Sequence, residues 1–81
     1  MQRGERMQTQ KEKTTPRTNL KIFRVANHLT QEAMAERIGF GRACYISVEK
    51  GRSEGRKAFW KAIEREFSLD AETVQALKKN D

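Results

Sequence analysis

Two glycines flank a phenylalanine and precede an arginine in Gly39-Phe40-Gly41-Arg42, and this spacing suits two kinds of chemistry. Glycine-rich loops bind phosphates because their backbone N–H groups can approach the anion closely. The same residues also suit the bend between two short helices. The first interpretation makes the chain a nucleotide binder or an enzyme fragment, and the second makes it a small helical module.

The surrounding residues disfavour a nucleotide-binding loop. A dinucleotide-binding loop follows a β-strand and has a third glycine where Cys44 stands, and the residues before Gly39 have a helical pattern. The Gly-Lys-Ser/Thr sequence that ends a phosphate-binding P-loop is also missing. The glycines are therefore interpreted as a bend.

Groups that catalyse reactions or bind metals are scarce in the sequence. His28 is the only histidine and Cys44 the only cysteine, so no nucleophile–base pair is evident and no zinc-binding set can form. We expect no enzymatic activity, no metal and no cofactor. No apolar run approaches the ~18 residues that cross a bilayer, so we expect a cytoplasmic protein without membrane contact.

The chain is basic, with a formal net charge of +6, and the charge is unevenly distributed. Residues 42–61 contain six basic and two acidic side chains, a net charge of +4, whereas residues 62–81 have a net charge of −2. A basic band of this kind is typical of proteins that bind polyanions, although charge alone does not separate DNA from RNA or an acidic membrane. A solvated face that serves only solubility is the simpler alternative.

The first 18 residues differ from the rest in composition. Only Met1 and Met7 are clearly apolar there, too few to offset the entropy lost on ordering the backbone. Residues 1–18 are therefore predicted to be a disordered basic tail. Residues 19–81 are predicted to form one small domain.

The pattern after residue 18 predicts an all-α fold, a compact bundle of five short helices. Strand-like alternation is absent, and apolar residues recur at helical spacing between capping residues and glycines. Asn19 is the expected N-cap of a first helix with Leu20, Phe23 and Ala26 on one face. The other expected helices are one between Thr30 and Gly39, one over about Arg42–Lys50, one over Arg56–Phe67 and one capped by Asp70.

The stretch LTQEAMAERIGFGRACYISVEKG, residues 29–51, carries the strongest signal in the sequence. It resembles the helix-turn-helix region of the Xre/Cro/phage-repressor (lambda-repressor-like) family of DNA-binding domains, and the resemblance extends over residues 20–69. The shared positions are Leu29-Thr30-Gln31-Glu32, Ala35-Glu36, Ile38-Gly39, Val48-Glu49 and Gly51. Gly41 departs from the family, which usually has a serine or threonine to cap the next helix.

This resemblance implies a helix-turn-helix over about residues 31–50 whose second helix, 42–50, reads the major groove. The implied base contacts are Arg42, Ala43, Ile46 and Ser47. The implied phosphate contacts are Gln31, Lys50 and Arg52. Arg24 and Glu49 match a pair that in several members of the family forms an ion pair between the first and third helices.

The sequence therefore predicts a sequence-specific regulator of transcription that binds double-stranded DNA. A small phage or mobile-element repressor is the expected type, acting as a weak homodimer or one assembled on DNA. The alternative is an antitoxin or adaptor that uses the same bundle to bind a protein partner. Ile22 and Val25 are the candidate partner contacts, with ordinary surface exposure as the simpler interpretation. Whether the tail also follows the DNA is a further open alternative.

Overall fold

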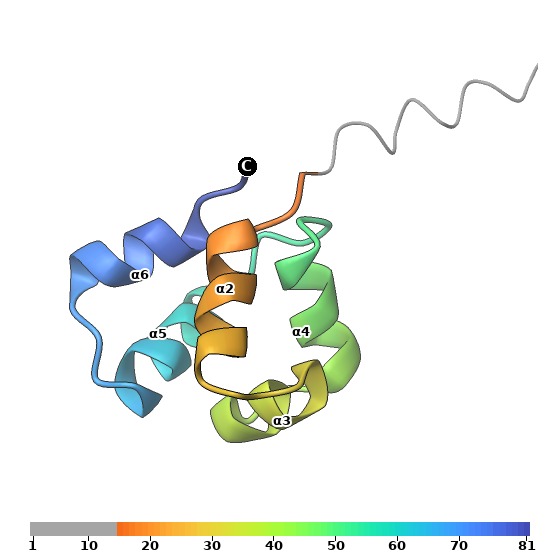
Figure 1. Ribbon diagram of the computed structural model, residues 1–81, viewed down its shortest axis with the longest axis horizontal. Helices are drawn as coiled ribbons and strands as arrows, with labels where there is room; N and C mark the ends of the chain where they lie inside the picture. Colours follow the sequence, from red (N-terminus) through yellow and green to blue (C-terminus); the bar gives the residue numbers. More distant parts are fainter. Residues whose placement is uncertain (1–14) are drawn as a thin grey trace, which may run out of the picture.

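The computed structural model describes residues 15–81, and it is all-helical within that range, as the sequence predicts. The five helices are arranged as a compact bundle (Figure 1). Their bounds are α2, Thr18–Ala26; α3, Gln31–Ile38; α4, Arg42–Glu49; α5, Lys57–Glu66; and α6, Ala71–Lys78. None of these helices is long and apolar enough to cross a membrane.

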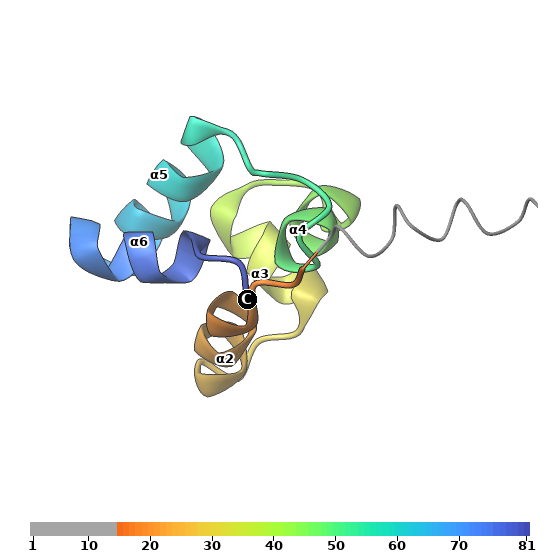
Figure 2. The same cartoon turned by 90° about the horizontal axis from the view of Figure 1, so that it is seen from above.

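The helices surround one core. α3 packs against α4 and α5, whereas α2 lies against α4 and α6, and α6 also contacts α5. Figure 2 shows α4 on one side of the bundle and the α5–α6 pair on the other, with α2 at the bottom of the view. Leu20, Tyr45 and Val48 are fully buried in this core, and Trp60 is also buried, with its indole N–H donating to the carbonyl of Glu54 (3.1 Å).

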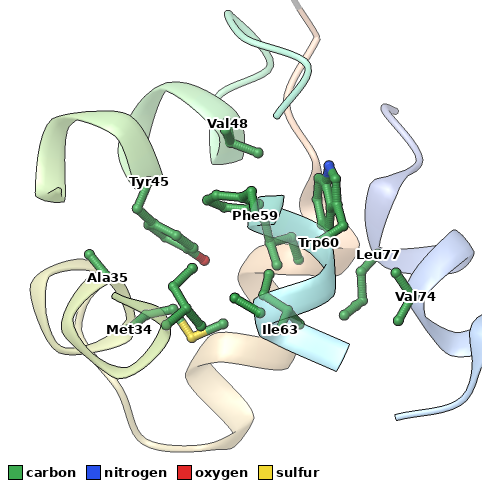
Figure 3. Packing of buried hydrophobic residues seen from close by; sticks show 12 residues of the cluster. Met34, Ala35, Tyr45, Val48, Phe59, Trp60, Ile63, Val74 and Leu77 are labelled. Atoms are coloured by element: carbon green, nitrogen blue, oxygen red, sulfur yellow. The ribbon is translucent and has the colours of Figure 1, made fainter. Parts of the chain in front are cut away.

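Phe59 of α5 is the centre of the aromatic packing. Its ring lies 5.3 Å from that of Phe40, 6.0 Å from that of Tyr45 and 5.0 Å from that of Trp60, measured between ring centroids. Figure 3 shows Phe59 between the Tyr45 and Trp60 side chains, with Met34 and Ile63 below them. Contacts of this kind join the turn, α4 and α5 into one unit. Phe40 of the Gly39-Phe40-Gly41 turn therefore packs inward against the core.

The bend between α3 and α4 has the features that the sequence predicts. Thr30 caps α3 by accepting a hydrogen bond from the amide of Ala33 (3.0 Å). Gly39 ends α3 in the left-handed conformation, with φ of 77°, which residues with a Cβ adopt only at a cost. Gly41 is the N-cap of α4 and supplies no side-chain hydrogen bond, so three residues join the two helices.

The start of the first helix corrects two predictions. Asn19 is not the N-cap: α2 begins at Thr18, its N-cap is Arg17, and the Asn19 amide donates to the carbonyl of Ala76 in α6 (3.2 Å). Ala26, expected on the inner face, is exposed. Propensity identifies good capping residues, but the contact with α6 selects a different role for this asparagine.

The boundary of the folded part also lies earlier than predicted. Most of the predicted tail, residues 1–14, lies outside the described residues, so the prediction of disorder and of DNA contact there is not tested. Within the described part, however, Arg17 is buried and Thr18 is helical, although both were assigned to the tail. The folded domain therefore includes residues before Asn19.

The last residues of the chain hold this early segment in place. Asn80 donates its side-chain amide to the carbonyl of Thr15 (2.9 Å), and the backbone amide of Asp81 donates to the carbonyl of Pro16 (2.9 Å). The carboxylate of Asp81 accepts hydrogen bonds from the backbone amide and the hydroxyl of Thr18. Figures 1 and 2 both show the C-terminus beside the first turn of α2.

Candidate nucleic-acid interface

α4 presents one exposed face at its N-terminal end. Arg42, the first residue of the helix, and Ala43 are exposed, and Ile46 and Ser47 one turn later are half-buried. Residues three or four apart lie on the same side of a helix, so Arg42 and Ala43 lie one turn from Ile46 and Ser47, and the four predicted base contacts form one continuous strip. The opposite side of α4 is buried in the core.

The guanidinium of Arg42 is available to a ligand. Only two ion pairs form within residues 15–81, Arg24 with Glu49 and Arg37 with Glu66, and Arg42 takes part in neither. Arg42 also stands at the start of α4, where the backbone N–H groups of the first turn add partial positive charge. An exposed, unpaired arginine in this position can make a two-pronged hydrogen bond to a planar acceptor.

Glu49, at the other end of α4, connects three helices through its carboxylate. Arg24 of α2 donates to it from Nε (2.8 Å to Oε2) and from Nη2 (3.3 Å to Oε1). Gln31 of α3 donates from Nε2 to Oε1 (2.9 Å), and the Tyr45 hydroxyl donates to Oε2 (2.7 Å). The predicted Arg24–Glu49 ion pair is therefore present, and it belongs to a larger buried network.

The network shifts the ionisation of its members. Burial of the Glu49 carboxylate opposes its ionised form, but the hydrogen bonds from Arg24, Tyr45 and Gln31 outweigh that effect and hold the pKa of Glu49 below its ordinary value. The hydrogen bond to Glu49 raises the pKa of Arg24. Burial, together with the bond to Glu49, raises the pKa of Tyr45. Glu49 and Arg24 are thus charged and Tyr45 neutral at pH 7.

Gln31, a predicted phosphate contact, is the first residue of α3 and is half-buried. Its side-chain amide has two hydrogens, and the bond to Glu49 uses one of them. The bond fixes where the amide lies relative to α4. Only the second hydrogen of the Gln31 side-chain amide is therefore left for the predicted contact with phosphate.

Lys50 and Arg52, the other predicted phosphate contacts, follow α4. Both are exposed, and Lys50 is the C-cap of the helix. The backbone amide of Arg52 donates to the carbonyl of Ser47 (2.9 Å), which turns the chain back over the helix end. Gly51 between them has φ of 81°, and a Cβ there would overlap the carbonyl of Thr15. Gly51 therefore allows the segment before α2 to pass directly against the end of α4.

Arg17 is the most important structural residue that the sequence interpretation missed. Its Nη1 donates to the carbonyls of Val48 (2.6 Å) and Ser53 (2.9 Å), and its Nε donates to the carbonyl of Lys78 (2.8 Å). Its guanidinium carbon lies 5.5 Å from the ring centroid of Trp60. The buried cation thus binds the C-terminal end of α4, where the helix dipole is negative, to the end of α6.

Ile22 and Val25, the candidate protein contacts, lie on the outer side of α2. They are the large apolar side chains most exposed to solvent in the described part, at 59% and 53%. They lie on the helix that also carries Arg24, whose side chain points inward to Glu49. The two apolar residues are therefore separate from the strip on α4.

The residues predicted to contact DNA lie in two groups, one along the outer strip of α4 and one at the C-terminal end of that helix. Arg42, Ala43, Ile46 and Ser47 share the outer strip of α4, and Gln31 and Lys50 lie near Glu49 at the other end of that helix. Within residues 15–81 no cluster of three or more histidine, cysteine, aspartate or glutamate side chains is arranged to hold a metal ion.

Comparisons with protein-family models, with curated proteins and with solved structures find no match.

Proposed function

We propose that this protein binds double-stranded DNA in a sequence-specific way and regulates transcription. The observation that carries the proposal is the exposed strip of α4, headed by an unpaired arginine and supported by a buried network at the opposite end of the helix. The three-residue turn with a left-handed glycine between α3 and α4 is typical of helix-turn-helix units. The resemblance to the Xre/Cro/phage-repressor family supports the same function.

In this proposal α4 lies in the major groove, which is wide enough to admit an α-helix. Arg42 donates to O6 and N7 of a guanine, the commonest specific contact of arginine with DNA. Ala43 and Ile46 contact thymine methyl groups, and Ser47 bonds to a neighbouring base edge. Three of these four side chains are short or apolar, so discrimination depends mainly on Arg42.

The proposed phosphate contacts are Gln31, Lys50 and Arg52. Gln31 stands at the N-terminus of α3, where free backbone N–H groups and the helix dipole attract a phosphate. Lys50 and Arg52 add two exposed positive charges after α4. Contacts of this kind fix the register of the protein on the duplex without reading its sequence.

The proposal extends to the protein's setting. A small regulator from a phage or mobile element, acting in the cytoplasm as a weak or DNA-assembled homodimer, accounts for the basic band. Two-fold dimers bind half-sites about one helical turn apart, so the operator is expected to be palindromic. Catalysis, metals and cofactors have no part in the proposal.

Replacing Arg42 with alanine tests the role of α4. Loss of a guanine contact should cost about 1–3 kcal/mol of binding free energy and relax the preference at one base position. Arg52→Ala, the matched control, should weaken all sequences alike. The measurement is a titration of each variant against the preferred duplex and its single-base substitutions. If Arg42→Ala also weakens every sequence equally, Arg42 contacts phosphate and the proposed reading geometry is wrong.

Ile22 and Val25 favour a second candidate, an antitoxin or adaptor that binds a protein partner through α2. Both side chains are more than half exposed, which leaves apolar surface available to a partner. The double variant Ile22→Ser, Val25→Ser should keep the free energy of unfolding within about 0.5 kcal/mol. The double variant should no longer copurify with a protein partner encoded beside this gene, whereas the wild type should. Equal copurification with the wild type and the variant contradicts this surface as the docking site.

A further inference from the structure

A hollow of about 430 Å³ lies where the start of α2, the start of α3 and the end of α4 meet. Three separate elements contribute to it, and it lies at the end of α4 opposite Arg42. The lining residues are Pro16, Arg17, Thr18, Lys21, Arg24, Gln31, Glu49 and Lys50. Its volume lies within the range of small-ligand sites in proteins, about 300–1,000 Å³.

The lining of the hollow is strongly cationic. Four of its side chains are basic, and Glu49 is the single acidic one. The charge of Glu49 is already compensated by the ion pair with Arg24 (2.8 Å). Asp81 accepts hydrogen bonds from Thr18 at the same edge and keeps its negative charge, which offsets one of the four basic side chains. The hollow therefore has a positive potential that no carboxylate of its own lining cancels.

The basic residues divide into two groups. Arg17 and Arg24 use their guanidinium groups for carbonyl and carboxylate acceptors inside the protein. Lys21 and Lys50 are exposed, and their ammonium groups make no ion pair or hydrogen bond within residues 15–81. The two arginines are therefore held in place by the protein, and the two lysines can donate hydrogen bonds to a ligand in the hollow.

Gln31 completes the set of donors. Its amide is held by Glu49 and keeps a second hydrogen for a ligand. Two free ammonium groups and one oriented amide, from α2, α3 and the C-cap of α4, match an anion with several acceptor oxygens. A phosphate group has this chemistry.

We propose that the hollow binds a phosphate group and that Lys21 is one of its ligands, together with Gln31 and Lys50. The inference rests on the proposed function in one respect, because the expected source of the phosphate is the backbone of the bound DNA. Lys21 then extends the interface from α3 and α4 to α2. A free phosphate ion has the same chemistry and is the other source to be tested.

Lys21→Ala tests the DNA source. Alanine favours helix, and Lys21 is exposed, so the variant should fold normally. The slope of log Kobs against log salt concentration should fall in magnitude by about 1, with equal loss of affinity for preferred and random duplexes. Lys61→Ala removes the same charge from α5, outside the hollow, and should change the slope much less.

A second arm uses inorganic phosphate and no DNA. Titration of the isotopically labelled protein should shift the amide resonances of residues 21, 31 and 50 together, and Lys21→Ala should abolish the shifts. If the protein binds DNA but Lys21→Ala behaves like Lys61→Ala, the DNA phosphate is not bound here. If the protein binds no DNA, the proposed function fails. Shifts of the amide resonances of residues 21, 31 and 50 on adding phosphate would then still support an anion site in the hollow. Absence of both the slope change and the shifts overturns the inference.

Discussion

Glu49→Gln is expected to lower the free energy of unfolding by about 3–5 kcal/mol, the largest effect that the structure predicts. Glutamine keeps the size of the side chain but removes the charge opposite Arg24. The side chains of the pair are only 11% and 6% exposed, so the guanidinium would remain buried without a counterion. Small domains have stabilities of ~5 kcal/mol upward, so much of the stability should be lost. Chemical denaturation measures the change.

Glu66→Gln provides the matched control. Glu66 forms the other ion pair of the described part, with Arg37 (3.0 Å), and those side chains are 44% and 38% exposed. An exposed pair contributes about 0–1 kcal/mol, so this variant should be close to wild type. Equal effects of the two substitutions would show that the Glu49 network does not hold α4 in place.

The same network predicts how stability depends on pH. Because the pKa of Glu49 is lowered in the folded state, its contribution is fully present above the ordinary carboxyl value of 4.5. As pH falls below that value, the unfolded state takes up the proton first, and the contribution is lost progressively until the folded-state pKa is passed. The stability difference between wild type and Glu49→Gln should therefore shrink below pH 4.5. A difference that grows there contradicts the assigned direction.

Arg17→Met should lower the free energy of unfolding by about 2–4 kcal/mol, the second large effect. Methionine keeps part of the buried stem but removes the three hydrogen bonds to the carbonyls of Val48, Ser53 and Lys78. Hydrogen bonds from a charged group contribute about 1.5–3 kcal/mol each, but the cost of burying the guanidinium, which also lowers the pKa of Arg17, offsets much of that gain. Thermal and chemical denaturation measure the effect.

The control for Arg17 is Arg52→Met, because Arg52 is an exposed arginine near the same end of α4. Its replacement should change stability by no more than about 0.5 kcal/mol. The comparison also tests where the domain begins. If residues before Asn19 were a tail, as the sequence alone predicts, Arg17→Met would be as harmless as the control. That result would contradict the position of Arg17 between α4 and α6.

Local patterns made much of the α3–α4 unit predictable. A capping threonine, apolar residues at helical spacing and a glycine at the bend each act within a few residues, and Thr30, Tyr45 and Gly39 all have the expected roles. The Arg24–Glu49 pair lies 25 residues apart in sequence and was predictable only through the family resemblance. The exposed strip of α4 follows from the same periodicity.

The contacts of Arg17 and Lys21 could not be predicted in this way. Arg17 is buried because carbonyls of three distant segments converge on it, and nothing in a single sequence separates it from the exposed arginines. The one local signal that Arg17 belongs to the fold is its position three residues before Leu20, where the apolar residues at helical spacing begin. Lys21 becomes a candidate only once α2, α3 and α4 are placed around the hollow. Long-range packing, rather than propensity, decides both positions.

Selection of bound duplexes from a random DNA pool tests the central proposal most directly. The account predicts enrichment of one sequence with two-fold symmetry, containing a guanine whose preference disappears with Arg42→Ala, and binding that weakens steeply as salt concentration rises. A pool that shows no enriched sequence after repeated rounds, with binding insensitive to salt, would contradict a DNA-reading role for α4.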